Sequence, residues 1–160
     1  MPKNFKPRLG GGDTGQTDLP RGKRVKKTSA RIGTLALLDE LAALLGLARA
    51  KLRGTKRAAE LRRIQRTLST AAAQAAGLDF QAALSEETAR LTARVAVLAA
   101  GRKPAKRFVL PGRDEAEALL HLARTKARIC ELALWKINCR PAARYLNRLS
   151  DYLFLLAGAK

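Results

Sequence analysis

The C-terminal stretch that begins at Arg144 constrains the fold more than any other part of the chain. Its apolar residues recur every three or four positions, the spacing of a helix with one buried face, and they are Tyr145, Leu146, Leu149, Tyr152, Leu153 and Leu156. Between them lie Asn147, Ser150 and Asp151, which favour helix less than Lys or Glu do. These polar residues are either the solvated face of a core helix or part of a binding site.

The rest of the chain repeats the helical pattern. Its 160 residues suffice for one domain with a single core, and a composition rich in Ala and Leu but only 4% aromatic favours helices. Helices are predicted from the N-cap Ser29 to about Gly54, from about Lys56 to Ala76, from Ser85 to about Gly101, from about Asp114 to Asn138, and after Pro141. With no strand pattern between them, we predict an all-α, five-helix bundle that forms a single domain over residues 29–160.

A basic, glycine-rich segment precedes this bundle. Gly10, Gly11, Gly12 and Gly15 surround Asp13, and a run of cations follows, namely Arg21, Lys23, Arg24, Lys26 and Lys27. Glycines let backbone N–H groups approach an anion closely, and the cations add charge to hold it. Residues 1–28 are therefore predicted to form a nucleotide-binding loop. Neither a Walker loop nor a dinucleotide fingerprint matches, and the alternative is a flexible basic tail.

Two further stretches carry candidate functional residues. The fourth predicted helix has four polar residues at spacings of three and four, so they share one side: His121, Arg124, Arg128 and Glu131. A lone histidine is more often a hydrogen-bonded structural residue than a ligand, and we predict no metal site. Ahead of this helix, the residue before Pro111 is biased towards extended geometry. Phe108 in that segment either faces a ligand or fills the core.

The net charge predicts the kind of partner, and the cysteines and apolar segments predict the cellular compartment. The formal net charge of +19, from 32 basic and 13 acidic residues, favours an anionic partner: nucleic acid, acidic lipid or a nucleotide. Along one helix Cys130 and Cys139 would lie ~13 Å apart, too far for a disulfide. No apolar run reaches the roughly 18 residues of a membrane span, and the first residues lack the apolar core of a signal peptide. We expect a cytoplasmic protein that does not contact a membrane.

Six short motifs resemble the ATP:cob(I)alamin adenosyltransferases of the propanediol-utilisation type. In chain order they are Gly12-Asp13-x-Gly15-x-Thr17, Arg24 with Lys27, Asp39-Glu40-Leu41, Phe108-x-Leu110-Pro111-Gly112, His121 to Thr125 with Arg128 and Glu131, and Tyr145 to Asp151. The motifs follow the family's order and span almost the whole chain.

The resemblance implies a five-helix bundle that forms a homotrimer, with each active site between two subunits. ATP would lie on the loop of one subunit and on two helices of its neighbour, held by Gly11, Gly12, Asp13, Thr17, Lys27, Arg128, Glu131 and Asn147. Asp39 would pair with Arg124 across the interface beside the corrin, and Phe108 would cover the lower face of the corrin. With Arg128, these are the implied catalytic residues.

The implied reaction is attack of the cobalt of cob(I)alamin on C5′ of ATP, with Mg²⁺ helping to neutralise the triphosphate that leaves. Fixed cations and a metal ion stabilise such a leaving group. A flavin-type reductase is a further partner that the resemblance admits. The chain departs from the family's pattern at Ile129 and Leu132, where arginines are usual, and at Ala42, where asparagine is usual.

Two other functions stay open. A basic, helical nucleic-acid-binding protein fits the charge, although aromatic residues for base stacking are scarce. A non-catalytic, corrinoid-binding protein of the same fold fits Ile129 and Leu132, because these residues remove two cations near the phosphates.

Overall fold

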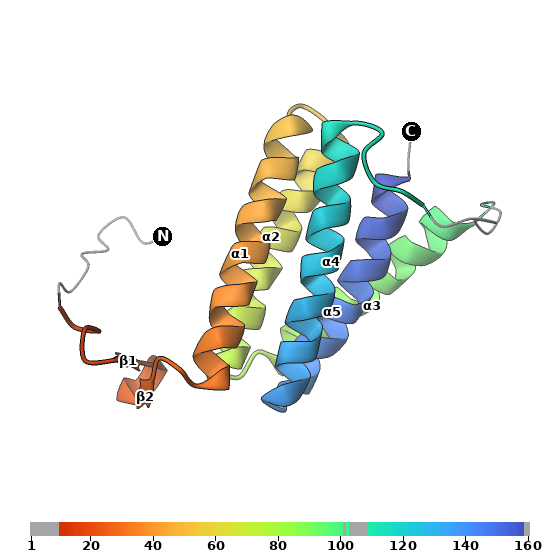
Figure 1. Ribbon diagram of the computed structural model, residues 1–160. Coiled ribbons are helices and arrows are strands. Elements are labelled where there is room, and N and C mark those ends of the chain that lie inside the picture. The colour runs from red at the N-terminus through yellow and green to blue at the C-terminus, as the bar shows by residue number, and fades with distance from the viewer. Residues whose placement is uncertain (1–9, 101, 103–108, 159–160) are drawn as a thin grey trace.

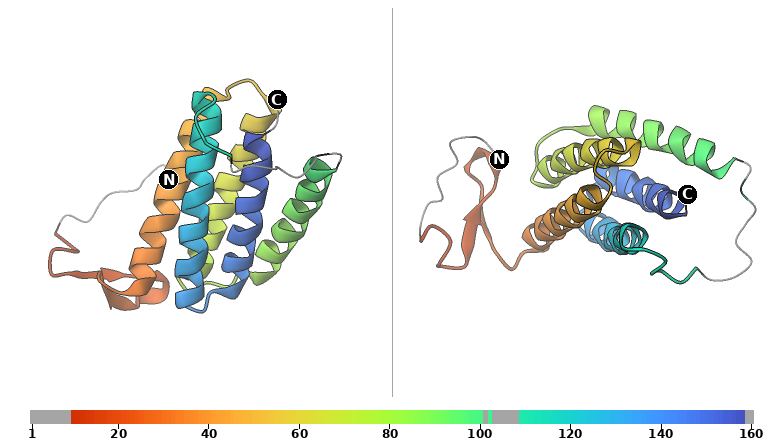
Figure 2. Two further views of the ribbon diagram at one scale, coloured as in Figure 1. Left: turned by 45° about the vertical axis from the view of Figure 1, so that its right-hand side comes forward. Right: turned by 90° about the horizontal axis from the view of Figure 1, so that it is seen from above.

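Five helices form the body of the protein, as predicted. The computed structural model describes residues 10–100, 102 and 109–158. Within them the helices are α1 (Ala30–Lys51), α2 (Lys56–Ala75), α3 (Gln81–Ala99), α4 (Glu115–Lys136) and α5 (Arg140–Ala157). Helices α1, α2, α4 and α5 run alongside one another, and α3 lies on the outer side of α2 and α5 (Figures 1 and 2). None of these helices is long and apolar enough to cross a membrane.

Helix α5 is the centre of the bundle. It contacts α2, α3 and α4, and it has more buried residues than any of the other four helices. Its predicted apolar stripe is buried throughout, with both tyrosines at 1% exposure or less. Each fully buried leucine of this stripe stabilises the fold by about 1.5–3 kcal/mol relative to an exposed one. The periodicity that dominates the sequence therefore marks the core.

Side-chain caps begin three of the helices, and at the start of α2 Thr55 Oγ1 accepts from the Ala58 N–H at 3.2 Å. Ser29 Oγ accepts from the Ile32 N–H at 3.5 Å, which confirms the predicted N-cap of α1, and Asp114 Oδ1 accepts from the Glu117 N–H at 2.9 Å at the start of α4. These oxygens satisfy N–H groups that have no partner inside the helix.

The predicted start of the third helix at Ser85 is wrong. Helix α3 begins at Gln81, one turn earlier. The side chain of Gln74, on α2, accepts from the Phe80 N–H at 2.6 Å, and Asp79 Oδ1 accepts from the Gln81 N–H at 3.1 Å. Because these two side chains satisfy the first N–H groups, the helix does not need the Ser85 hydroxyl as its cap.

A small hairpin precedes the bundle, and the prediction of no strands is wrong here. Strands β1 (Gln16–Asp18) and β2 (Arg24–Lys26) pair antiparallel with Thr17 opposite Val25. The connecting turn contains two residues with positive φ, Arg21 at 64° and Gly22 at 73°. We call residues 10–28 the arm, since they project away from the bundle beyond the first turn of α1 (Figures 1 and 2).

Candidate functional site

The glycine loop of the arm lies against an exposed lysine, Lys27. The Gly15 N–H donates to the Gly12 carbonyl at 3.1 Å, and the Lys27 N–H donates to the Gly15 carbonyl at 2.8 Å. A Cβ added at Gly12 would lie only 2.6 Å from the Lys27 Nζ. The ammonium group therefore occupies space that is open only because residue 12 is glycine. A cation held against a glycine-rich backbone is suited to binding phosphate.

Arg24 ties the arm together. Its guanidinium donates from Nη1 to Asp18 Oδ1 at 3.0 Å, from Nε to Gln16 Oε1 at 3.2 Å and from Nη2 to the Gly11 carbonyl at 3.3 Å. Three bonds from one planar group fix the hairpin to the glycine loop. Arg24 belongs to one of the sequence motifs, but its position in the sequence does not predict this role. Thr17 lies in the hairpin, and Asp13 lies at the tip of the loop beside Gly10.

A second group of predicted residues lies on α4 and α5. Arg124 and Arg128 line a small cavity of about 290 Å³, whose other walls come from α5: Ser150, Asp151, Phe154 and Leu155. Asp151 accepts from Arg148 Nη1 at 2.7 Å. Arg128 is exposed and has no hydrogen bond or ion pair within the described part of the chain. Its charge is thus available to an anion.

The two remaining predicted residues of this group lie close to the cavity on the same helices. Glu131 Oε1 accepts from Trp135 Nε1 at 3.4 Å, and Asn147 is exposed on α5, where its carbonyl accepts from the Ser150 hydroxyl at 2.8 Å. The Asn147 side chain is therefore turned towards solvent and can meet a ligand.

Asp39 is exposed on α1, and it does not pair with Arg124 within one chain. The neighbouring Glu40 forms an ion pair with Lys126 at 2.7 Å, whereas Asp39 has no partner among the described residues. Pairing of Asp39 with Arg124 across a subunit interface stays a prediction.

His121 is part of a buried hydrogen-bonded chain that the sequence analysis did not find. Its Nε2 lies 3.2 Å from Glu117 Oε1, and its Nδ1 accepts from Arg124 Nε at 3.3 Å. The other Glu117 oxygen accepts from the N–H groups of Gly112 at 2.8 Å and Arg113 at 3.2 Å. The bond from the Gly112 N–H lowers the pKa of Glu117, although burial opposes this shift. An acid four residues before a histidine on one helix was the available signal.

The predicted site residues thus form two groups that one chain does not bring together. Among the described residues, the arm makes its hydrogen bonds within itself and to Ser29, while Arg128, Glu131 and Asn147 lie on the bundle. Figures 1 and 2 show the arm directed away from α4 and α5. Phe108 lies outside the described residues.

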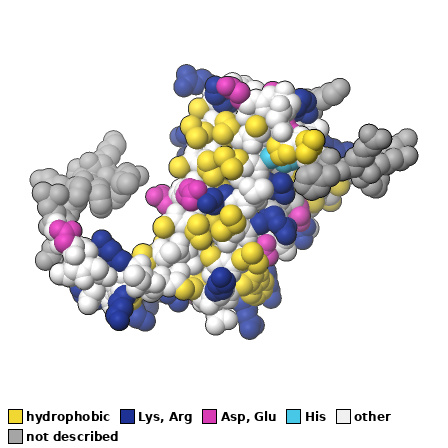
Figure 3. All heavy atoms as spheres, in the orientation of Figure 1, with side chains coloured by type: hydrophobic (Ala, Val, Ile, Leu, Met, Phe, Trp, Pro, Cys, Tyr) yellow, Lys and Arg dark blue, Asp and Glu magenta, His cyan; other side chains and the backbone are white. Residues whose placement is uncertain are grey.

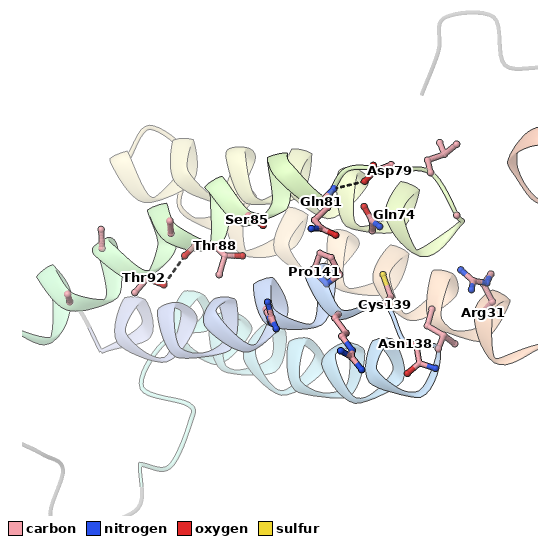
Figure 4. Close-up of a pocket in the computed structure, with 18 residues that line it drawn as sticks. Arg31, Gln74, Asp79, Gln81, Ser85, Thr88, Thr92, Asn138, Cys139 and Pro141 are labelled. Carbon is pink, nitrogen blue, oxygen red and sulfur yellow. Dashed lines mark hydrogen bonds between the residues drawn. The ribbon is translucent and has the colours of Figure 1, made fainter.

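A larger cavity lies elsewhere in the described structure. It has a volume of about 1100 Å³ and runs between α3, the α2–α3 connection and the start of α5 (Figure 4). Ser85, Thr88 and Thr92 point into it from α3, opposite Pro141, and Arg31 closes one end. None of the predicted site residues lines this groove.

An apolar surface covers α1 and α4 on the side seen in Figure 3. We call it the α1/α4 face, and its large exposed residues are Leu47, Leu122, Ile129 and Leu132. Leu132 is 62% exposed and Ile129 is 47% exposed. Both lie close to Arg128 on α4, and Glu40 of α1 pairs with Lys126 of α4, so charged and apolar groups share this face.

A helical bundle with an exposed lysine against a glycine-rich loop, and with two arginines lining a cavity on a separate helical surface, defines a protein of the anion-binding, all-α class. A model of one family, described as cobalamin adenosyltransferase, matches residues 8–159. The chain belongs to this family.

Several known proteins are similar in sequence. The corrinoid adenosyltransferases PduO of Citrobacter freundii and Salmonella typhimurium are each 38% identical over 160 residues, which cover 93% of this chain and 48% of theirs. The chain therefore spans about half the length of these two relatives. The corrinoid adenosyltransferase of Bacillus subtilis is also 38% identical over 160 residues, which cover 91% of this chain and 81% of that protein.

Solved structures show the same fold. One is a variant PduO-type ATP:corrinoid adenosyltransferase from Lactobacillus reuteri complexed with cobalamin and ATP, with a TM-score of 0.84, 24% identity and coverage of 95% of this chain and 89% of that one. A second variant from the same organism, complexed with ATP, has a TM-score of 0.81, 26% identity and coverage of 91% and 89%.

Proposed function

We propose that the protein transfers the 5′-deoxyadenosyl group of ATP to cob(I)alamin, producing adenosylcobalamin and triphosphate. Family membership supports this activity, and so do relatives named corrinoid adenosyltransferases. The observation that carries the proposal for this chain is the position of the exposed Lys27 side chain against Gly12, where a Cβ would lie 2.6 Å from the ammonium nitrogen. That arrangement fits a phosphate chain.

In this proposal the cobalt of the bound corrinoid forms a bond to C5′ of ATP while the bond from C5′ to the triphosphate oxygen breaks. Negative charge develops on the leaving triphosphate, so Lys27 and Arg128 stabilise the transition state more than the ground state. Gly11, Gly12, Asp13 and Thr17 line the nucleotide from the arm, and Glu131 and Asn147 line it from the helices. Phe108 covers the lower face of the corrin.

The proposal includes Mg²⁺ bound mainly through the triphosphate. The described residues contain no cluster of three or more His, Cys, Asp or Glu side chains that could hold a metal ion. Mg²⁺ commonly binds through one or two carboxylates and substrate phosphates, and Asp13 and Glu131 are the acids of the two groups. A flavin-type reductase that supplies cob(I)alamin and a cytoplasmic location complete the proposal.

We further propose a homotrimer in which the arm of one subunit lies against α4 and α5 of the next. The arm projects from its own bundle (Figures 1 and 2), and Asp39 and Arg128 are both exposed and have no partner within the described residues. A closed ring of identical subunits would bring Asp39 to Arg124 of its neighbour at every interface. The exposed apolar residues of the α1/α4 face would be buried in the same contact.

An anaerobic assay with ATP and chemically reduced cobalamin tests the activity. We expect turnover by the wild type and a loss of ~10²–10³-fold in kcat for Lys27→Ala, since one preorganised stabilising group is removed. Lys26→Ala is the matched control, because Lys26 carries the same charge on the neighbouring residue of the hairpin, whereas the side chain that meets Gly12 is that of Lys27. Corrinoid binding without turnover by the wild type would instead identify a non-catalytic homologue.

Mixed oligomers test the shared site. Lys27→Ala and Arg128→Ala subunits should each be inactive alone. When they are co-expressed in equal amounts, roughly a quarter of the sites pair an intact arm with an intact α4, and activity should return to about that level. A monomer that sediments as such while it turns over would contradict the trimer.

A further inference from the structure

Three side chains link the segment before α4 to the cavity on α4 and α5. Glu117, at 5% exposure, accepts from the backbone N–H groups of Gly112 and Arg113, and it contacts the ring of His121, at 4% exposure. His121 in turn contacts Arg124, which lines the cavity. A buried carboxylate, a buried imidazole and a half-buried guanidinium therefore lie in series.

The donors and acceptors of this series fix the tautomer of His121. Arg Nε is only ever a donor, so His121 Nδ1 must carry a lone pair to accept from it at 3.3 Å. The ring proton then lies on Nε2 and is donated to Glu117 Oε1 at 3.2 Å. A proton on Nδ1 would place the Nδ1–H donor of His121 against the Nε–H donor of Arg124. The ring of Phe154 packs edge-on against His121 at 6.0 Å between centroids, which restrains the ring plane.

The Arg124 guanidinium is hydrogen-bonded through Nε, whereas its two terminal nitrogens have no partner within the described residues. The bond through Nε therefore orients the group and leaves its two NH₂ groups for another partner. A positioning interaction has this form, since it fixes direction without occupying the atoms that would contact a substrate or a facing carboxylate.

We propose that Glu117 and His121 are positioning residues: Glu117 holds His121 as the Nε2–H tautomer, and the Nδ1 lone pair directs the Arg124 guanidinium into the cavity shared with Arg128. The consequence for catalysis rests on the proposed function, whereas the tautomer itself does not. Glu117 is thereby assigned a role that its place in the first turn of α4 does not suggest.

The test is Glu117→Gln, which keeps the size of the side chain. The amide oxygen can still accept from Gly112 and Arg113, but the NH₂ group then faces His121 Nε2 and requires it to accept. The ring proton moves to Nδ1, so Nδ1 can no longer accept the hydrogen bond from Arg124 Nε. Because His121 is the only histidine of the chain, a long-range ¹H–¹⁵N spectrum reports its tautomer without ambiguity.

We expect the wild type to show protonated Nε2 and the variant protonated Nδ1, with kcat lowered roughly 10–100-fold and KM for ATP little changed. Glu115→Gln is the matched control, since Glu115 lies on the same turn, exposed and paired with Lys51. It should alter neither the spectrum nor kcat. A wild-type spectrum with Nδ1 protonated, or a changed tautomer with unchanged kcat, would overturn the inference.

A second pair of variants separates positioning from structural support. In His121→Asn the amide oxygen can take the place of Nδ1 and accept from Arg124, while in His121→Gln the amide NH₂ can take the place of Nε2 and donate to Glu117. At matched melting temperatures the asparagine variant should retain at least tenfold more kcat. Equal kcat in the two variants refutes the positioning role. Absence of adenosyl transfer by the wild type would refute the proposed function and leave the tautomer measurement standing.

Discussion

Replacing Gly12 by alanine should displace the ammonium group of Lys27 without disturbing the fold. The backbone at Gly12 does not have the positive φ of its neighbours Gly10 and Gly15, so alanine can adopt it. The new Cβ would lie 2.6 Å from Lys27 Nζ and 2.8 Å from Lys27 Cε, whereas ordinary contacts begin near 3.4 Å. The end of the lysine side chain is flexible, so it should move aside by roughly 1 Å.

This displacement sets the size of the effect. At an effective dielectric constant of about 20, moving a unit cation from about 3 Å to about 4 Å from a unit negative charge costs about 1.4 kcal/mol. This corresponds to about a tenfold loss in rate. We therefore expect kcat/KM for ATP to fall about tenfold in Gly12→Ala, less than in Lys27→Ala. The melting temperature should not change, because the arm lies outside the helical core.

The assay is kcat/KM for ATP under anaerobic conditions with reduced cobalamin, in a double-mutant cycle with Lys27→Ala. If Gly12 acts only by leaving room for Lys27, Gly12→Ala has no further effect once Lys27 is alanine. Gly33→Ala is the control, since a Cβ there meets nothing within 4 Å, and it should raise stability by up to about 1 kcal/mol with unchanged kinetics. Additive losses in the double variant would refute the explanation.

Three further predictions concern stability and thiol reactivity. Arg90 donates to Glu60 at 2.6 Å and to Glu87 at 2.9 Å, and all three side chains are about one-fifth exposed. Arg90→Ala should lower the free energy of unfolding in urea by about 2–3 kcal/mol, less than the roughly 3–5 kcal/mol expected for a fully buried pair. An unchanged urea midpoint would contradict this. The hydrogen bond from the Glu117 N–H lowers the pKa of the Asp114 carboxyl in the folded state. The ionised carboxylate therefore stabilises the fold above its unfolded pKa of about 3.9, and this stabilisation is lost as the pH falls through the lower, folded pKa. The urea midpoint of Asp114→Asn should accordingly lie below that of the wild type at pH 7, and the two should converge in acid. Burial raises the pKa of Cys130 to about 12, so at pH 8 a thiol reagent should modify it at the rate of unfolding, and rapid labelling of the native protein would be inconsistent with this packing.

The helices could be predicted because their signals are local and repeated. The apolar stripe of α5 and the cap at Ser29 can both be identified within a few residues of sequence, and both are confirmed. The start of α3 could not be predicted in this way, because the side chain that satisfies the Phe80 N–H comes from Gln74 on another helix. The hairpin strands have three residues each, too few for an alternating pattern. Arg24 joins them to the glycine loop through a bond to Gly11, 13 residues away in sequence.

The sequence predicts individual candidate residues for the site but not the contacts between them. Lys27 was expected to bind phosphate, yet only the structure shows that the absence of a Cβ at Gly12 makes room for its ammonium group. Glu117 was missed because one carboxylate in the first turn of a helix suits the helix dipole without any functional role. Its bonds to two backbone N–H groups and to His121 depend on how the preceding segment folds back.

The apolar α1/α4 face would make the assembly of the proposed trimer depend on temperature. In the trimer proposed above, Ile129 and Leu132 would be buried on assembly in place of the arginines usual at these positions. Burial of apolar surface carries a negative heat-capacity change, and the hydrophobic contribution to association weakens on cooling. The oligomer would then be cold-labile: diluted protein kept on ice would dissociate and lose its shared sites, and warming would restore them.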